Sequence, residues 1–390
     1  MNQHLALEVV DGIKKTIRPD GVKFVPLHSP TFDDTESRHV VDCVKSGWVS
    51  SVGPEVDNFE RELASACGVK RAIATVNGTA ALHLALVLAG VHPGEEVVVP
   101  TLSFVATANA VTYAGAIPHF ADSELDTLGL DPSKLSEHLD AIAEVKGDFC
   151  FNRETGKRIA ALVPMHTFGH PVKIQQLMNL AKKWRIPLVE DAAESLGSRF
   201  HGKPAGSFGM VSAVSFNGNK IITTGGGGAI LTNDDVIADR AKHLSSTAKV
   251  PHRWKYFHDV IAFNYRMPNL NASLGLAQLE KLENFVQKKR ELAEKYALQL
   301  DPIDGISFFK EPDECRSNYW LNAILIDQSN LQLLDQILDA TNDAGIMTRP
   351  AWEPLHRLPM FSSCPAMDLS TSVNIAERLI CIPSGAGLLS

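Results

Sequence analysis

The stretch that decides the fold reads Ser212-Ala-Val-Ser-Phe-Asn-Gly-Asn-Lys220-Ile-Ile-Thr-Thr-Gly-Gly-Gly-Gly-Ala-Ile230. Residues 211–216 alternate apolar and small side chains, as a buried strand does, and a second strand follows the glycine turn at 225–228. Lys220 stands between the strands with no other charged residue beside it. Burial lowers the pKa of a lysine, and the resulting amine suits Schiff-base chemistry with a carbonyl compound. A lysine that reaches from a loop into water is the alternative.

Length and composition describe a globular protein with one large and one smaller domain. The chain has 390 residues, of which 45% are hydrophobic and 21% are charged, as in ordinary folded proteins. Its net charge of -8 argues against a nucleic-acid partner, because proteins that bind nucleic acid carry a basic patch. We expect neither a signal peptide nor a membrane span, and therefore a cytoplasmic protein.

The cysteine and glycine patterns argue against a disulfide framework, a metal site and a dinucleotide-binding loop. The six cysteines are scattered and form no CxxC pair, which indicates reduced thiols and predicts no metal site. The glycine run at 225–228 does not fit a dinucleotide-binding loop, because Ile230 stands where the third glycine belongs and a strand follows.

From Arg71 onward, short apolar strands alternate with amphipathic helices. The strands are expected at 72–76, 96–99, 117–120, 159–163 and 187–189, and the helices at 79–88, 104–113 and 172–184. This alternation predicts a mostly parallel sheet with helices on both faces. Ligands of such sheets bind at the carboxyl ends of the strands. That edge should bring together Asn77-Gly78-Thr79, Asp191 and Lys220.

The chain is expected to divide into three parts. Residues 1–22 should form an N-terminal arm or helix, 23–270 a large α/β domain, and 271–390 a small α+β domain. The other expected elements are helices at 34–46, 56–67 and 331–344, a hairpin-type insertion at 147–157, a single long helix at 273–300, and a strand at 324–326.

Four residues at the predicted edge have both a chemical and a structural interpretation. Gly78 and Thr79 open a helix after a strand and could bind an anion, or could form an ordinary helix start. Asp191 could pair with a pyridinium nitrogen or cap the following segment. Phe104 could stack on a flat ring or pack in the core. A phosphate loop, an aromatic ring, a carboxylate and a lysine are together what pyridoxal phosphate requires.

With these motifs the sequence resembles the sugar aminotransferases of the DegT/DnrJ/EryC1/StrS family, which have the aspartate-aminotransferase-like type I pyridoxal-phosphate fold. The resemblance covers nearly the whole chain. Its motifs are Ser46-Gly-Trp-Val-Ser50, Asn77-Gly-Thr-Ala-Ala-Leu82, Pro100-Thr-Leu-Ser-Phe-Val-Ala-Thr107, Glu190-Asp-Ala-Ala-Glu194, Ser215-Phe-Asn-Gly-Asn-Lys220 and Phe263-Asn-Tyr-Arg-Met267.

The resemblance implies a role for each matching residue. Lys220 looks like the Schiff-base lysine and proton shuttle, Asp191 like the partner of the pyridine nitrogen, and Phe104 like the stacking ring. The residues implied to hold the phosphate are Gly78, Thr79, Ser215 and, from the neighbouring subunit, Asn264. The active site should therefore need a homodimer with shared sites.

Three positions depart from the family pattern. Glu194 stands near the pyridoxal oxygen where many members have Gln or His, and Asn217 replaces a His or aromatic residue. Gly226 replaces the usual Glu of the glycine turn. Glu194 and Asn217 are still expected among the cofactor contacts. For the substrate, the residue types suited to a nucleotide-sugar are Trp48, Ser50, Arg349 and His356.

The sequence thus predicts a pyridoxal-phosphate-dependent aminotransferase that moves an amino group, from glutamate, onto C4 of a nucleotide-linked 4-keto-6-deoxysugar. The form Asn217-Gly-Asn-Lys220 and the insertion near 150 resemble the branch acting on UDP-4-keto-6-deoxy-N-acetylglucosamine. The alternatives are a sugar dehydratase of the same fold, which has His at the lysine position, a non-catalytic pyridoxal-phosphate-binding regulator, and a nucleotide-binding module.

Overall fold

A central β-sheet forms the middle of the structure, a computed structural model that describes residues 2–17 and 23–389. Its strands are β1 (Arg71–Thr75), β2 (Glu96–Pro100), β3 (Ile117–Ala121), β6 (Ile159–Leu162), β7 (Val189–Asp191), β10 (Val211–Ser215) and β11 (Gly228–Thr232). They form two ladders, ordered β1-β11-β10-β7 and β3-β2-β6, which parallel bridges from Leu162 to Leu188 and from Met165 to Asp191 join. β11 is antiparallel to β1 and β10, whereas the other pairs are parallel. The expected mostly parallel sheet is confirmed.

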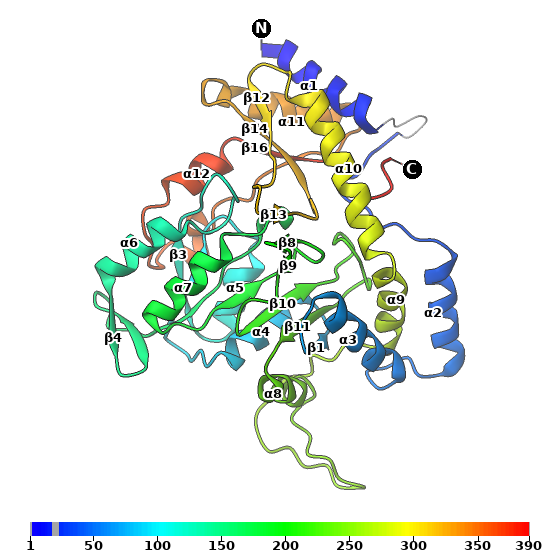
Figure 1. Ribbon diagram of the computed structural model, residues 1–390, viewed down its shortest axis with the longest axis vertical. Helices are drawn as coiled ribbons and strands as arrows, with labels where there is room; N and C mark the ends of the chain where they lie inside the picture. Colours follow the sequence, from blue (N-terminus) through cyan, green and yellow to red (C-terminus); the bar gives the residue numbers. More distant parts are fainter. Residues whose placement is uncertain (1, 18–22, 390) are drawn as a thin grey trace.

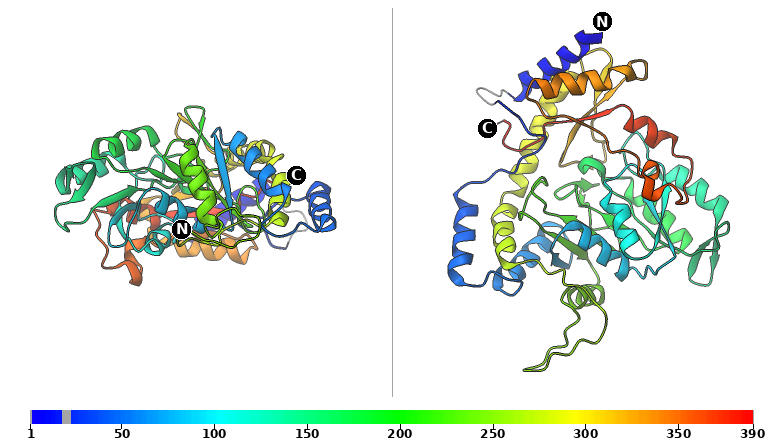
Figure 2. Two further views of the ribbon diagram at one scale, coloured as in Figure 1. Left: turned by 90° about the horizontal axis from the view of Figure 1, so that it is seen from below. Right: turned by 180° about the vertical axis from the view of Figure 1, so that it is seen from behind.

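Helices cover both faces of this sheet (Figures 1 and 2). They are α3 (Pro54–Ala66), α4 (Gly78–Leu88), α5 (Ala106–Tyr113), α6 (Pro132–Ile142), α7 (Ile174–Trp184), α8 (Asp235–Ser245) and α9 (Asn269–Leu279). Alternate strand residues point to opposite faces. Ile73 enters the core with α4, α5 and α8, whereas Ala72 and Ala74 enter the core with α3 and α9. Val98 packs on α6 and α7. The strands are therefore buried on both sides and hold the sheet edge rigidly.

A smaller antiparallel sheet, ordered from β12 through β14 and β16 to β15, forms the C-terminal part. Its elements are β12 (Ile306–Phe308), β14 (Asn322–Ile326), β15 (Arg349–Pro350), β16 (Leu379–Ile382), α10 (Leu282–Leu300) and α11 (Leu334–Asp343). The N-terminal helix α1 (Asn2–Ile17) packs against α10 and α11, and its apolar side chains enter the core of this part. The N-terminal helix and the C-terminal part therefore share one hydrophobic core, and they lie side by side at one end of the molecule (Figure 1).

The long helix expected at 273–300 is wrong in one respect, because the structure divides it. α9 ends at Leu279 and α10 begins at Leu282. At the break, Lys281 forms ion pairs with Asp33 (2.7 Å) and Glu36 (2.8 Å). The apolar spacing continues across the break, so the sequence pattern does not reveal it. α9 packs on α2 (Asp34–Ser46) and α3, while α10 reaches the C-terminal sheet.

Two smaller expectations are shifted. The insertion is a hairpin of β4 (Ala143–Lys146) and β5 (Phe149–Asn152), a few residues earlier than 147–157. The helix expected at 331–344 begins as a 3-10 turn, Gln328–Leu333, before α11.

The domain division stays a prediction: its boundary at 270–271 falls inside α9, and residues 18–22 of the expected N-terminal segment lie outside the described residues. The remaining strands and α-helix are β8 (Arg199–Phe200), β9 (Lys203–Pro204), β13 (Cys315–Arg316) and α12 (Ser370–Ala376), and 3-10 turns lie at Thr167–Gly169, Leu355–Arg357 and Pro359–Phe361.

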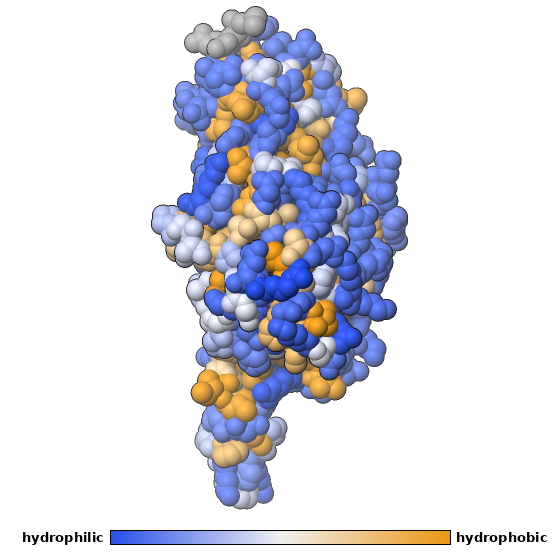
Figure 3. Space-filling view, turned by 90° about the vertical axis from the view of Figure 1, so that its left-hand side faces the viewer, coloured by the Kyte–Doolittle hydropathy of each residue, from blue (hydrophilic) through white to orange (hydrophobic). Residues whose placement is uncertain are grey.

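Residues 247–264 form an arm that projects beyond α8 (Figure 1). Several large apolar side chains of this arm are exposed, among them Trp254, Tyr256 and Ile261, which is 97% exposed. Hydrophobic patches are visible on the projecting part in the space-filling view (Figure 3). Among the described residues, no helix is long and apolar enough to cross a membrane.

Candidate active site

A cavity of about 630 Å³ opens where the carboxyl ends of the central strands meet the C-terminal part. Nine of the residues expected at a site line it, namely Gly78, Thr79, Phe104, Asp191, Glu194, Ser215, Asn217, Lys220 and Arg349. The strand ends bring them together from stretches that lie far apart in the chain, as expected for a parallel sheet.

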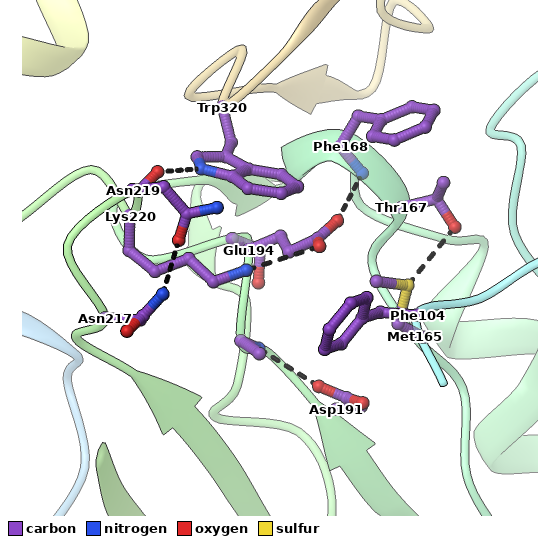
Figure 4. A network of polar contacts seen from close by, with 12 residues as sticks. Phe104, Met165, Thr167, Phe168, Asp191, Glu194, Asn217, Asn219, Lys220 and Trp320 are labelled. Carbon is purple, nitrogen blue, oxygen red and sulfur yellow. Dashed lines mark hydrogen bonds and ion pairs between the residues drawn. The ribbon is translucent and has the colours of Figure 1, made fainter. Parts of the chain in front are cut away.

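Lys220 lies in the connection between β10 and β11 and points into the cavity (Figure 4). Its Nζ is 3.3 Å from Glu194 Oε1 and 3.8 Å from the centre of the Trp320 ring. Its side chain is only 12% exposed. The alternative interpretation, a lysine that reaches into water, is therefore wrong.

Asp191 is the last residue of β7, and its carboxylate is buried beside the cavity. Its Oδ2 accepts a hydrogen bond from Thr107 Oγ1 at 2.7 Å, and its Oδ1 accepts one from the Ala193 N–H at 3.2 Å. Burial raises the pKa of the Asp191 carboxyl, while the bonds from Thr107 and Ala193 and the charge of Lys220 oppose that rise. The carboxylate is thus held rigidly with few partners of its own, which suits pairing with a cationic ring nitrogen.

Glu194 follows β7 by three residues and is also buried. Its Oε2 accepts a hydrogen bond from the Phe168 N–H at 2.9 Å, which aims Oε1 at Lys220 (Figure 4). Burial raises the pKa of the Glu194 carboxyl to about 7, against the opposing effects of Lys220 and the Phe168 N–H. The group can therefore lose or gain a proton near neutral pH beside the reactive amine.

The start of α4 forms an anion cradle against the end of β10. Asn77 caps the helix, since its side chain accepts a hydrogen bond from the Ala80 N–H at 2.7 Å. A Cβ on Gly78 would lie 2.7 Å from the Ser215 Cβ, so only glycine lets the helix start approach this closely. The cradle therefore presents backbone N–H groups, the positive end of a helix dipole and the hydroxyls of Thr79 and Ser215. This donor set fits a phosphate.

Four expected site residues do not line the cavity within one chain. Asn264 is exposed and pairs with Ser246 at the base of the arm. Trp48 and Ser50 lie after α2, where their carbonyl oxygens accept hydrogen bonds from the Asn269 side chain and backbone, each at 2.7 Å. His356 Nδ1 lies 2.8 Å from Thr101 Oγ1, outside the cavity.

The structure adds cavity residues that sequence reasoning missed. Three of them are aromatic: Phe168 comes from the loop after β6, and Trp320 and Trp352 come from the C-terminal part. None of the three belongs to a family motif quoted above, although Trp352 lies between the expected site residues Arg349 and His356. Thr107 could have been found, because it follows Phe104 in the same family motif. His28 also lines the cavity, and both of its ring nitrogens are buried without a hydrogen-bond partner.

Comparison with known proteins agrees with this geometry. The model of the DegT/DnrJ/EryC1/StrS aminotransferase family matches residues 30–390. GDP-perosamine synthase from Vibrio cholerae is 37% identical over 93% of this chain and 95% of its own. The putative pyridoxal phosphate-dependent aminotransferase EpsN from Bacillus subtilis is 37% identical over 94% of this chain and 92% of its own.

Two more distant relatives extend the comparison. The dTDP-4-dehydro-2,3,6-trideoxy-D-glucose 4-aminotransferase from Saccharopolyspora spinosa is 29% identical over 92% of this chain and 91% of its own. Among solved structures, the aminotransferase TlmJ from Streptoalloteichus hindustanus superposes with a TM-score of 0.83 at 29% identity, and the match covers 93% of each chain.

Proposed function

Because the chain belongs to the DegT/DnrJ/EryC1/StrS aminotransferase family, we propose that it transfers an amino group from glutamate to C4 of a nucleotide-linked 4-keto-6-deoxysugar. Membership makes it a pyridoxal-phosphate-dependent sugar aminotransferase that acts on nucleotide-linked ketosugars. The position of the amino group, the donor and the sugar are the proposed parts. The observation that carries the proposal is the Lys220 amine 3.3 Å from the buried Glu194 carboxylate, in the same cavity as the buried Asp191 carboxylate.

The residues of the cavity divide the work of binding and proton transfer. The cofactor, when bound, supplies an electron sink for the carbon whose amino group is exchanged. In our assignment the cradle of Gly78, Thr79 and Ser215 holds its phosphate, Phe104 stacks on its ring, and Asp191 pairs with its ring nitrogen. Lys220 holds the cofactor and moves the proton at the reacting carbon, and Glu194 exchanges a proton with the Lys220 amine.

The apolar residues of the cavity wall opposite Asp191 favour a 6-deoxysugar as the substrate. Phe168 lies between two indoles, with ring centres 4.7 Å from Trp352 and 6.4 Å from Trp320, and Leu321 and Met347 extend the wall. An apolar wall makes favourable contacts with a methyl group, whereas a hydroxyl buried against it would lose its hydrogen bonds. The C6 methyl of a 6-deoxysugar fits such a wall better than a C6 hydroxyl.

Further observations support the proposed position of amination, the diphosphate and the nucleotide of the substrate. The Saccharopolyspora relative is named as a 4-aminotransferase, which supports amination at C4. Arg349 lines the cavity with its guanidinium near the surface, where a cation suits a diphosphate. For the nucleotide we place GDP first, because the Vibrio relative is named for a GDP-sugar. The UDP-sugar expected from the sequence has no counterpart among the relatives named above, so we rank it below the GDP-sugar.

A panel of substrates tests the proposal. The purified chain, loaded with pyridoxal phosphate, is incubated with ¹⁵N-glutamate and the GDP-, UDP- and dTDP-linked 4-keto-6-deoxysugars, and the products are identified by mass and NMR. We expect ¹⁵N at C4 of the GDP-linked sugar, and borohydride reduction should attach the cofactor to Lys220. Label at another carbon, or no label with any of the three nucleotides, would refute the assignment.

We also propose that the enzyme works as a homodimer whose subunits share each site. Asn264 does not line the cavity of its own chain and lies exposed beside Ser246. The arm at 247–264 and the segment around Trp48 expose apolar side chains that a second copy would cover. In this arrangement Asn264 reaches the phosphate held in the neighbouring chain.

A further inference from the structure

Trp320 makes the closest aromatic contact with the Lys220 amine. It lies in the link between β13 and β14, in the C-terminal part, and its ring centre is 3.8 Å from Lys220 Nζ. Glu194 Oε1 contacts the same amine at 3.3 Å. Figure 4 shows the amine between the indole and the carboxylate. An ammonium is attracted to the electron-rich face of an indole, so both contacts favour the same position of the side chain.

The indole is held in place by the rest of the molecule. Its Nε1–H donates a hydrogen bond to the carbonyl of Asn219 at 2.6 Å, one residue before Lys220. Its backbone N–H donates to Asn318 Oδ1 at 2.8 Å. Its carbonyl accepts a hydrogen bond from Lys289 Nζ at 3.2 Å, and the ring stacks on Phe168. Trp320 thus holds both the lysine's amine and the backbone next to it.

Lys289 anchors this arrangement from α10. Its side chain is fully buried, and burial lowers the pKa of its amine well below the usual value. The amine donates to the carbonyls of Trp320 and Ser384. These two bonds hold the backbone at Trp320 and the backbone at Ser384, just after β16, in fixed positions. The C-terminal core therefore holds the backbone of Trp320, while the bond to the Asn219 carbonyl orients its indole toward the loop that carries Lys220.

We propose that Trp320 is a positioning residue that holds the amine of Lys220 beside Glu194 whenever that amine is not attached to the cofactor. An aminotransferase lysine is free during part of each half-reaction and must stay within reach of the reacting carbon to move its proton. The indole face provides a resting place that acts only on the free, protonated amine. The inference rests on the role assigned to Lys220 under the proposed function.

Chemical labelling of Lys220 tests this role without any turnover. The full chain, stripped of cofactor, is pulsed with formaldehyde and cyanoborohydride at fixed pH, and methylation of the Lys220 peptide is followed by mass spectrometry. Trp320→Phe and Trp320→Met both lose the indole N–H, but only the first keeps a ring. We expect Lys220 to be labelled about 3- to 10-fold faster in Trp320→Met than in the wild type, and within about 2-fold of the wild type in Trp320→Phe.

Controls separate the ring contact from general loosening. Trp352→Leu alters the same cavity wall but has no contact with Lys220, so its Lys220 labelling should match the wild type. Labelling of the exposed Lys70 serves as the internal standard. If Trp320→Met does not fold, Lys289→Met removes the anchor and keeps the indole, and should raise Lys220 labelling at least about 2-fold.

The outcomes distinguish this inference from the proposed function. Equal labelling of Lys220 in the Phe and Met variants would overturn the role of the ring, even if the enzyme aminates its sugar. Failure of Lys289→Met to change the rate would overturn the anchor. If no ketosugar is aminated but the labelling order holds, the positioning role stands and the proposed substrate falls.

Discussion

At the scale of single residues, the site depends on two buried carboxylates that differ in their hydrogen-bond partners. Asp191 is bonded to Thr107 and the Ala193 N–H, away from Lys220, whereas Glu194 reaches the Lys220 amine directly. Burial raises the pKa of both carboxyls. Neighbouring acids with different partners are suited to different tasks, the first to hold a charge and the second to exchange a proton.

Asp191→Asn should weaken catalysis far more than cofactor binding. The amide keeps the shape and the hydrogen bonds but cannot hold a proton on a ring nitrogen, so the cofactor loses much of its power as an electron sink. We expect a loss of roughly 10²-fold or more in kcat. Single-turnover kinetics and cofactor titration measure the two effects separately. Turnover close to that of the wild type would refute the role given to Asp191.

Glu194→Gln should flatten the pH dependence of stability in the chain stripped of cofactor. The pKa of the Glu194 carboxyl is raised from 4.5 to about 7 by burial. Between these values the folded chain keeps a proton that the unfolded chain has lost. Its contribution to stability is therefore fully present below pH 4.5 and is lost as the pH rises to about 7.

The free energy of unfolding, measured in urea at about pH 5 and about pH 8, should fall by about 2 kcal/mol less in Glu194→Gln than in the wild type. Glu62→Gln changes an exposed carboxyl and should leave the wild-type slope unchanged. Parallel slopes for the wild type and Glu194→Gln would show that the carboxyl does not keep its proton in the folded chain.

At the scale of elements, the decisive contact is the one between the start of α4 and the end of β10. The helix start approaches Ser215 closely because Gly78 has no Cβ, and Asn77 satisfies an N–H that would otherwise lack a partner. The same junction then presents the remaining donors to the cavity. Backbone packing, more than any one side chain, thus creates the anion cradle.

Gly78→Ala should weaken cofactor binding through this contact. The new methyl group would lie 2.7 Å from the Ser215 Cβ, so the helix start must move away from β10 and the cradle must widen. We expect the Kd of pyridoxal phosphate to rise about 10-fold or more. Gly226→Ala is the matched control, because no atom lies within 4 Å of the place that its new methyl group would take. An unchanged Kd in Gly78→Ala would place the phosphate elsewhere.

At the scale of the whole molecule, the cavity joins two parts with separate cores. The central sheet supplies the lysine, the carboxylates and the cradle, and the C-terminal part supplies Trp320, Arg349 and Trp352. Asn264, at the base of the projecting arm, does not line the cavity of its own chain. A complete site therefore needs both parts of one chain and, in our proposal, the arm of another.

Mixing two inactive variants tests the shared site. Lys220→Ala removes the reactive amine, and Asn264→Ala removes the contact that we assign to the other chain. A mixed dimer would contain one site with both residues intact, so some activity should return, up to about a quarter of the wild-type level per chain when mixing is random. Native mass spectrometry confirms the mixed dimers. If they form and remain inactive, Asn264 acts on its own chain or has no role in the site.

The sequence by itself determined the mostly parallel sheet and the group of residues at its edge. Short apolar strands that alternate with amphipathic helices place the carboxyl ends on one side, so the positions of Gly78, Asp191 and Lys220 follow from local pattern and chain order. The family motifs added the cofactor. These patterns can be read locally in the sequence, because a strand that is buried on both faces of the sheet must be apolar along its length.

Only the tertiary structure decided what surrounds the lysine. Trp320 and Trp352 lie far along the chain from Lys220 and belong to none of the family motifs, and a tryptophan can equally well be part of a core. The break between α9 and α10 was also invisible, because the apolar spacing runs through it while the ion pairs of Lys281 with Asp33 and Glu36 lie across distant segments. Contacts between residues far apart in the chain depend on how separate cores pack, and periodicity carries no information about that packing.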